Sequence, residues 1–108
     1  MNKLLACVAV VTLSFSVQSF ANKCPSKLEH YQFAISKVER KLISPRSAIF
    51  SGFEDTTIFS FGDGCEQRTI GDVDSHNNYG VMIRSVWMVN SVYDKQSGRL
   101  NVEMINVE

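Results

Sequence analysis

Hydrophobic positions recur along this chain at helical spacing before Pro45 and at roughly alternate residues after Thr57. In the first region the apolar residues share one helical face, at Leu28, Tyr31, Ile35, Val38 and Leu42. Ser26 and Glu29 form a capping-box sequence at its start, and Ser44-Pro45 ends it, because the residue before proline is pushed out of the α region. The pattern predicts one helix over residues 26–43, with His30 at the boundary of the apolar stripe.

Four β-prone segments follow, at residues 57–61, 65–73, 79–93 and 99–107. Gly62-Asp63-Gly64 is a tight-turn sequence that joins the first two in a hairpin, and Gly71 is a candidate β-bulge. Residues 45–51 read as an extended crossover and residues 52–56 as a polar loop. The sequence therefore predicts an α+β fold, in which one N-terminal helix packs on a four-stranded antiparallel sheet (α-β-β-β-β).

The long segment 79–93 is apolar on both faces from Val86 onward. One parity holds Tyr79, Val81, Ile83, Trp87 and Val89, and the other holds Met82, Arg84, Val86, Met88 and Val92. In the last segment, Leu100, Val102 and Met104 alternate with polar residues, as in a sheet with one solvated face. One helix covers one face of such a sheet. The second face is therefore either a candidate interface or is covered through strong twist and the N-terminal residues.

Residues 1–21 have the features of a secretory signal peptide. Lys3 precedes an apolar run from Leu4 to Val17, and Ser19-Phe20-Ala21 places small residues where signal peptidase recognises them. The run is shorter than the roughly 20 residues of a membrane-spanning helix, and Cys7 lies too early for a lipoprotein signal. We expect a single domain at residues 22–108, without a membrane anchor after cleavage, in the periplasm or secreted.

Cleavage after Ala21 leaves two of the three cysteines, Cys24 and Cys65. An even pair in an oxidising compartment favours a disulfide, and reduced thiols or a metal pair are the alternatives. Loss of Lys3 leaves 11 − 1 = 10 basic residues against 11 acidic ones. Without a basic patch, nucleic acid and anionic lipid are not expected partners. We expect no cofactor, and the sequence leaves the oligomeric state open.

Oxygen and nitrogen ligand atoms gather at Asp72, Asp74, His76 and Asn77. A calcium loop would need glycine and glutamate where this chain has Asn77 and Ile83, and zinc would need another His or Cys nearby. Asp and Asn side chains also bond local backbone amides in turns. We therefore interpret four residues as a turn motif without a metal: Asp72, Asp74, Asn77 and Gly80.

Arg84 is a charged residue within an apolar stretch. It would contact an anion or a partner, form an ion pair with Asp72 or Asp74, or lie at an edge in solvent. Two functional hypotheses follow. The first is a non-enzymatic protein-binding domain (inhibitor, immunity or assembly factor) that acts through Met82, Arg84, Trp87 and Met88. The alternative is a small hydrolase or metal-dependent enzyme centred on His76 with Asp72 and Asp74, although no nucleophile-elbow sequence is present.

Two separated segments carry a resemblance, Ser44-Pro45-Arg46-Ser47-Ala48-Ile49-Phe50 and the stretch from Gly71 to Arg84. Together they resemble a pattern of small exported or phage-encoded bacterial proteins, SPxSAxF followed by GxVDxxNxxGxxxR. The matching residues are Pro45, Ser47, Ala48, Phe50, Gly71, Val73, Asp74, Asn77, Gly80 and Arg84. The resemblance spans about half of the mature chain and implies a shared α+β fold and no reaction.

Overall fold

The computed structural model describes residues 23–108, so the predicted signal peptide lies outside the described residues. Their elements are the helix α2 (Lys27–Glu39), the short 3-10 turns η1 (Pro45–Ser47) and η2 (Phe53–Asp55), and five strands. The strands are β1 (Ile49–Phe50), β2 (Thr57–Phe61), β3 (Glu66–His76), β4 (Met82–Asp94) and β5 (Arg99–Val107). No helix among these residues is long and apolar enough to cross a membrane.

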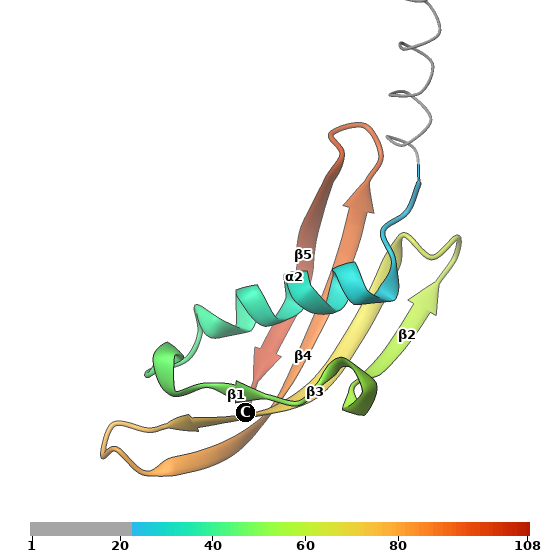
Figure 1. Cartoon of the computed structure of the whole chain (residues 1–108). Coiled ribbons are helices and arrows are strands. Elements are labelled where there is room, and N and C mark those ends of the chain that lie inside the picture. The colour runs from blue at the N-terminus through green and yellow to red at the C-terminus, as the bar shows by residue number, and fades with distance from the viewer. Residues whose placement is uncertain (1–22) are drawn as a thin grey trace, which may run out of the picture.

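All strand pairings are antiparallel, in the order β1-β3-β4-β5, and β2 pairs with the same edge of β3 as β1 does. The helix α2 lies across one face of this sheet (Figure 1). The predicted α+β fold, with one helix packed on an antiparallel sheet, is therefore confirmed. The structure has one strand more than the four predicted. This strand is β1, two residues long at Ile49–Phe50, and it pairs with Val73 and Asp74 of β3. It is too short to show an alternating pattern in the sequence.

The helix begins as predicted, because Ser26 accepts a hydrogen bond from the Glu29 amide at 3.2 Å and the Glu29 carboxylate reaches back to the Ser26 amide. It ends at Glu39 rather than at residue 43. The Lys41 and Leu42 amides bond to carbonyls only three residues back, at Val38 and Glu39. These shorter-range bonds tighten the last turn into a non-α geometry before Pro45 is reached.

The buried line of the helix is His30, Ala34 and Val38, spaced four residues apart. This line is rotated from the predicted stripe, and Leu28 at its start is 45% exposed. Tyr31, Ile35 and Leu42 are only partly buried beside the core. His30, expected at the boundary, is instead fully buried. The small side chain of Ala34 lies at the middle of the buried line, where the helix meets the sheet.

The core lies between α2 and the sheet, and its buried sheet residues are Val73, Trp87 and Val89. The β3–β4 ladder runs without a register shift from Glu66 to His76, so the predicted bulge at Gly71 is wrong. A Cβ at Gly71 would lie 2.7 Å from the Trp87 ring and 2.8 Å from Ser51 Oγ. Glycine therefore stands there because Trp87 packs over its backbone.

A bulge occurs instead between β4 and β5, where Asn90 pairs with Met104 but Ser91 pairs with Val102, leaving out Glu103. An extra residue reverses the alternation along a strand. Ile105 and Val107 consequently pack toward the core, whereas Met104 is 48% exposed. The even alternation predicted for residues 99–107 therefore holds only up to the bulge.

Candidate functional site

The sheet face opposite α2 is not covered by any element among residues 23–108 (Figure 1). Side chains of successive strand residues point to opposite faces, so the residues that alternate with Val73, Trp87 and Val89 point to this side. Cross-strand pairs such as Ile70–Met88 and Asp72–Val86 extend the assignment from β3 to β4. We call this surface the open face. Its apolar members are Ile49, Phe59, Phe61, Ile70, Met82, Val86, Met88, Val92 and Met104.

Several of these apolar side chains are half in solvent. Val86 is 53% exposed, Phe59 is 50% exposed and Met104 is 48% exposed. They come from β4, β2 and β5, three strands that the sheet brings onto one surface. Exposed apolar residues scattered singly need no explanation, but apolar residues gathered on one sheet face indicate a contact surface.

The predicted partner-binding residues divide between the two faces. Met82, Arg84 and Met88 lie on the open face, and Met82 is 45% exposed. Trp87 does not lie with them, because its odd position points it toward α2, where it is fully buried. Its ring packs edge-on against Phe50, with the centroids 6.2 Å apart. Trp87 is a core residue, and its inclusion in the predicted surface is wrong.

A charged group borders the open face near the end of the β3–β4 hairpin. Arg84 donates to both oxygens of the Asp74 carboxylate, at 2.8 and 3.1 Å, which is one of the arrangements expected from the sequence. These hydrogen bonds lower the pKa of Asp74 and raise that of Arg84. A depression of about 330 Å³ adjoins this pair, lined by Ile49, Phe50, Ser51, Asp55, Asp72, Asp74 and Arg84. The open face thus has apolar side chains interspersed with the charged residues Glu66, Arg68 and Asp72, and it ends at the Asp74–Arg84 pair.

Two residues of the predicted turn motif, Asn77 and Gly80, shape the turn between β3 and β4. The Asn77 side chain accepts the Tyr79 and Val81 amides at 2.9 and 3.0 Å, and Gly80 has a φ of 76° that L-residues rarely adopt. Asp74 is not in the turn, because β3 continues to His76, and neither is Asp72. The Asp72 carbonyl accepts the Ser51 amide, and the Asp72 amide donates to Ser51 Oγ. These contacts join β1 to β3.

The two segments of the sequence pattern lie side by side in the fold. Ile49 pairs with Asp74 and Phe50 pairs with Val73, while Ser47 Oγ accepts the His76 amide at 2.8 Å. A crossover and a hairpin more than twenty residues apart therefore form one local unit. Its contacts give the pattern residues structural roles, but they do not test the resemblance, which stays a prediction.

The residues of the alternative enzyme hypothesis occupy one side of β3. Asp72, Asp74 and His76 alternate along the strand, and the Asp74 carboxylate is held by Arg84. They are not among the groups whose ligand atoms converge within metal-binding distance in residues 23–108. No observation at these positions favours a hydrolytic or metal-dependent site.

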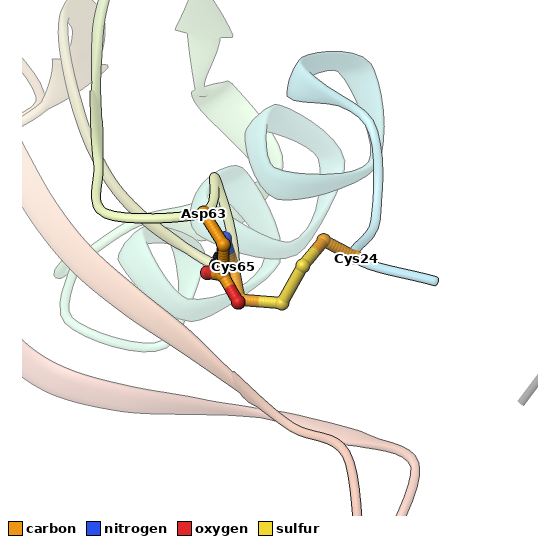
Figure 2. Close-up of side chains that lie close together, drawn as sticks. All are labelled: Cys24, Asp63 and Cys65. Atoms are coloured by element: carbon orange, nitrogen blue, oxygen red, sulfur yellow. Dashed lines mark hydrogen bonds between the residues drawn. A yellow bond between two sulfur atoms is a disulfide. The ribbon is translucent and has the colours of Figure 1, made fainter. Parts of the chain in front are cut away.

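The ligand atoms that do converge belong to Cys24, Asp63 and Cys65, all within 4.8 Å of one another (Figure 2). The two cysteines form the predicted disulfide, with their Cα atoms 4.8 Å apart, so the sulfurs bond to each other. Asp63 accepts the Cys65 amide at 3.1 Å and pairs with Lys95 at 3.0 Å. The backbone hydrogen bond, with Lys95 second, lowers the pKa of Asp63. This cluster joins the N-terminal segment to the β2–β3 turn.

One polar contact in the core was not anticipated from the sequence. His30 Nδ1 lies 2.7 Å from Ser91 Oγ, and both side chains are fully buried. The His30 Nε2 atom has no hydrogen-bond partner among the described residues. Burial lowers the pKa of His30 below 6.5. Neither residue lines any of the described depressions. Both side chains are fully buried, so the pair belongs to the core.

The sequence analysis also missed members of the open face from other strands, namely Ile49, Phe59, Phe61, Ile70 and Met104. It placed Val86 and Val92 on the parity of Met82 but did not include them among the partner-binding residues. Their exposure depends on the pairing register and on which face α2 covers. No protein family, curated protein or solved structure shows significant similarity to the chain. The functional argument therefore depends on the geometry of this fold alone.

Proposed function

We propose that the protein is an exported, non-enzymatic protein-binding domain, an inhibitor, immunity or assembly factor, that engages its partner through the open face. The observation that carries this proposal is the gathering of half-exposed apolar side chains from β2, β4 and β5 on the sheet face opposite α2. Burying such a surface against another protein removes apolar area from water, which is the main favourable term in association.

The composition of the surface is consistent with an interface. Aromatic and methionine side chains are enriched at protein interfaces, and polar residues surround the buried centre. The open face has Phe59, Phe61 and three methionines, bordered by the Asp74–Arg84 pair. The methionine side chains are flexible enough to fit an irregular partner surface.

An exported location is part of the proposal. The predicted signal peptide supports periplasmic or secreted delivery. The Cys24–Cys65 disulfide is compatible with an oxidising compartment. A cross-linked sheet and helix also present the open face on a rigid support, which lowers the entropy lost on binding.

The proposal predicts that Met88→Arg weakens partner binding at least about tenfold, because it places an unpaired charge beside Ile70 and Val86 of the open face. The measurement is a pull-down of exported proteins from the source cells with the oxidised domain, followed by titration of the purified partner. Val86→Arg repeats the test at a position that is 53% exposed.

Leu28→Arg is the matched control, since Leu28 is 45% exposed on α2, away from the open face. It is expected to leave binding unchanged. Equal affinity of all three arginine variants would exclude the open face as the interface. Unfolding of both Met88→Arg and Val86→Arg would place these residues in a core and remove the basis of the proposal.

A further inference from the structure

The strand β2 lies at an edge of the sheet, with β3 on one side and no strand on the other among residues 23–108 (Figure 1). Its pairs with β3 run without interruption from Thr57–Ile70 through Phe59–Arg68 to Phe61–Glu66. An unpaired strand edge presents a row of amide and carbonyl groups that can pair with another strand.

The direction of the β2 backbone groups follows from the bonds of β3. The Cys65 carbonyl accepts the Tyr93 amide and so points to β4, whereas the Asp72 carbonyl accepts the Ser51 amide and so points to the β1 side. Bonding direction alternates along a strand, so Glu66, Arg68 and Ile70 bond toward β2. Their partners Thr57, Phe59 and Phe61 bond inward, and Ile58 and Ser60 direct their amides and carbonyls outward.

The two edges of the sheet differ in their protection against pairing. The outer edge of β5 has Arg99 and Glu103, and Glu103 lies in the bulge opposite Asn90 and Ser91. Charges and bulges are the features that keep natural edges from pairing. The β2 sequence TIFSF has no charge and no proline, and its ladder has no bulge. Phe59 and Phe61, half in solvent, flank the free backbone groups.

We propose that β2 pairs with β2 of a second copy of this chain, antiparallel about a two-fold axis at Phe59. Phe59 is the central residue of β2, so this axis pairs the whole strand. Ile58 of each copy then lies opposite Ser60 of the other, and each such pair exchanges two backbone hydrogen bonds. The outward-pointing groups are therefore self-complementary in this register.

The side chains fit the same register. Phe59 faces Phe59 of the second copy in a non-hydrogen-bonded pair, where side chains come closest, and Thr57 faces Phe61. The four phenylalanines of the two copies form one aromatic cluster on a continuous open face. Contacts between paired aromatic residues stabilise this cluster. The strand has no charged residue, and the chain without residues 1–21 has 10 basic against 11 acidic residues, so net charge opposes the approach of two copies only weakly. This inference goes beyond the proposed function and does not depend on it.

A register-specific cross-link tests the pairing. In the proposed dimer the Cα atoms of the two residues 59 lie about 4.5 Å apart, within the range of about 4.4–6.8 Å that a disulfide spans. Phe59→Cys in the otherwise oxidised chain is expected to form a covalent dimer under mild oxidation. Ser60→Cys is the matched control, because its two copies are about 8 Å apart and point to the other face. Peptide mapping verifies that Cys24–Cys65 is retained.

We expect at least about tenfold more covalent dimer from Phe59→Cys than from Ser60→Cys. Equal amounts from the two variants would overturn the proposed register. Sedimentation equilibrium of the unmodified chain supplies the second measurement, with a dimer expected that dissociates on dilution. A monomer at all concentrations tested would overturn the proposal.

Backbone substitution separates edge pairing from other contacts. Ser60→Pro removes an outward amide that β3 does not use, and it is expected to give a monomer, whereas Ser60→Ala keeps the amide and the dimer. If the proline variant loses the native fluorescence of Trp87, Ser60→Lys replaces it, because lysine on an edge strand opposes pairing. A dimer that persists in both Ser60→Pro and Ser60→Lys contradicts the proposal. A monomer that still binds its partner through Met88 would leave the proposed function standing and refute only the dimer.

Discussion

At the scale of single residues, His30 is a titratable group held inside the core. Its ring is fully buried and bonds Ser91, and burial is the main cause of its lowered pKa, which the nearby Glu29 partly opposes. A protonated His30 ring would place a positive charge among buried groups, and its hydrogen-bond partner there is the neutral hydroxyl of Ser91. The folded state therefore favours the neutral imidazole.

The burial of His30 predicts a specific pH dependence of the free energy of unfolding. Because the folded pKa lies below the unfolded value of 6.5, the unfolded chain binds a proton first as the pH falls. Stability present above pH 6.5 is then lost as the pH falls through the folded pKa. Urea unfolding followed by Trp87 fluorescence, between about pH 7.5 and pH 5, measures this loss.

His30→Gln is expected to flatten that dependence between the same two pH values. His76→Gln is the matched control, since it removes the other histidine of the domain. If the pH dependence of the unfolding free energy disappears in His76→Gln and persists in His30→Gln, the titrating group is His76, and this account is refuted.

Gly71 allows a second prediction, about close packing. A Cβ there would lie 2.7 Å from the Trp87 ring and 2.8 Å from Ser51 Oγ. Gly71→Ala should therefore lower the free energy of unfolding by about 1–3 kcal/mol, the usual range for overpacking. Gly52→Ala is the control, with no atom within 4 Å of the added Cβ, and a change within about 0.5 kcal/mol is expected. Equal effects in urea unfolding would contradict the packing argument.

At the scale of elements, local sequence signals located most of the structure. The Ser26–Glu29 capping box, the Gly62-Asp63-Gly64 turn and the turn at residues 94–98 lie where the sequence predicted them. Each depends on bonds within a few residues. The errors at the short strand β1 and at the bulge opposite Asn90 arose where a distant element decides. The early end of α2 is instead a local effect of its tightened last turn.

The disulfide joins the segment before α2 to the turn after β2 across 41 residues. In the chain-entropy account, a loop of this length stabilises the folded state by about 4 kcal/mol. The double variant Cys24→Ala/Cys65→Ala should show this loss in urea unfolding. Reduction of the unmodified chain serves as the comparison. A loss below about 1 kcal/mol in both would mean that native-state contacts already restrain these segments.

At the scale of the whole molecule, α2 buries one face of the sheet in the core and leaves the other face at the surface. Val86 and Val89 lie in the same strand, but Val86 is 53% exposed and Val89 is fully buried. A threonine keeps the β-branched shape and adds a hydroxyl. Val89→Thr should lower the free energy of unfolding by about 1–3 kcal/mol, because the hydroxyl is buried. Val86→Thr should stay within about 0.5 kcal/mol.

Equal losses in these two variants, measured by urea unfolding, would mean that both faces are covered in solution. If Val86 is covered only at high protein concentration, the result would point to association through the open face. Measuring both variants over a range of protein concentrations distinguishes these cases.

The candidate surface was only partly predictable. The sequence showed that segment 79–93 is apolar on both faces, and it placed Met82, Arg84 and Met88 on one parity. It did not show that Trp87 belongs to the core, because parity says which residues share a face but not which face a helix covers. Phe59 and Met104 join the surface through register with β3 and β4, which is a non-local property.

The sequence by itself determined the fold class, the start of the helix and the turns at residues 62–64 and 94–98, and it favoured the pairing of Cys24 with Cys65. Hydrophobic period, capping, turn residues and cysteine number act locally or by counting. Tertiary structure alone decided the burial of His30 and Trp87, the close approach at Gly71, and the position of the open face. Those features depend on how α2 packs against one side of the twisted sheet, a choice made by the summed contacts of residues distant in the chain.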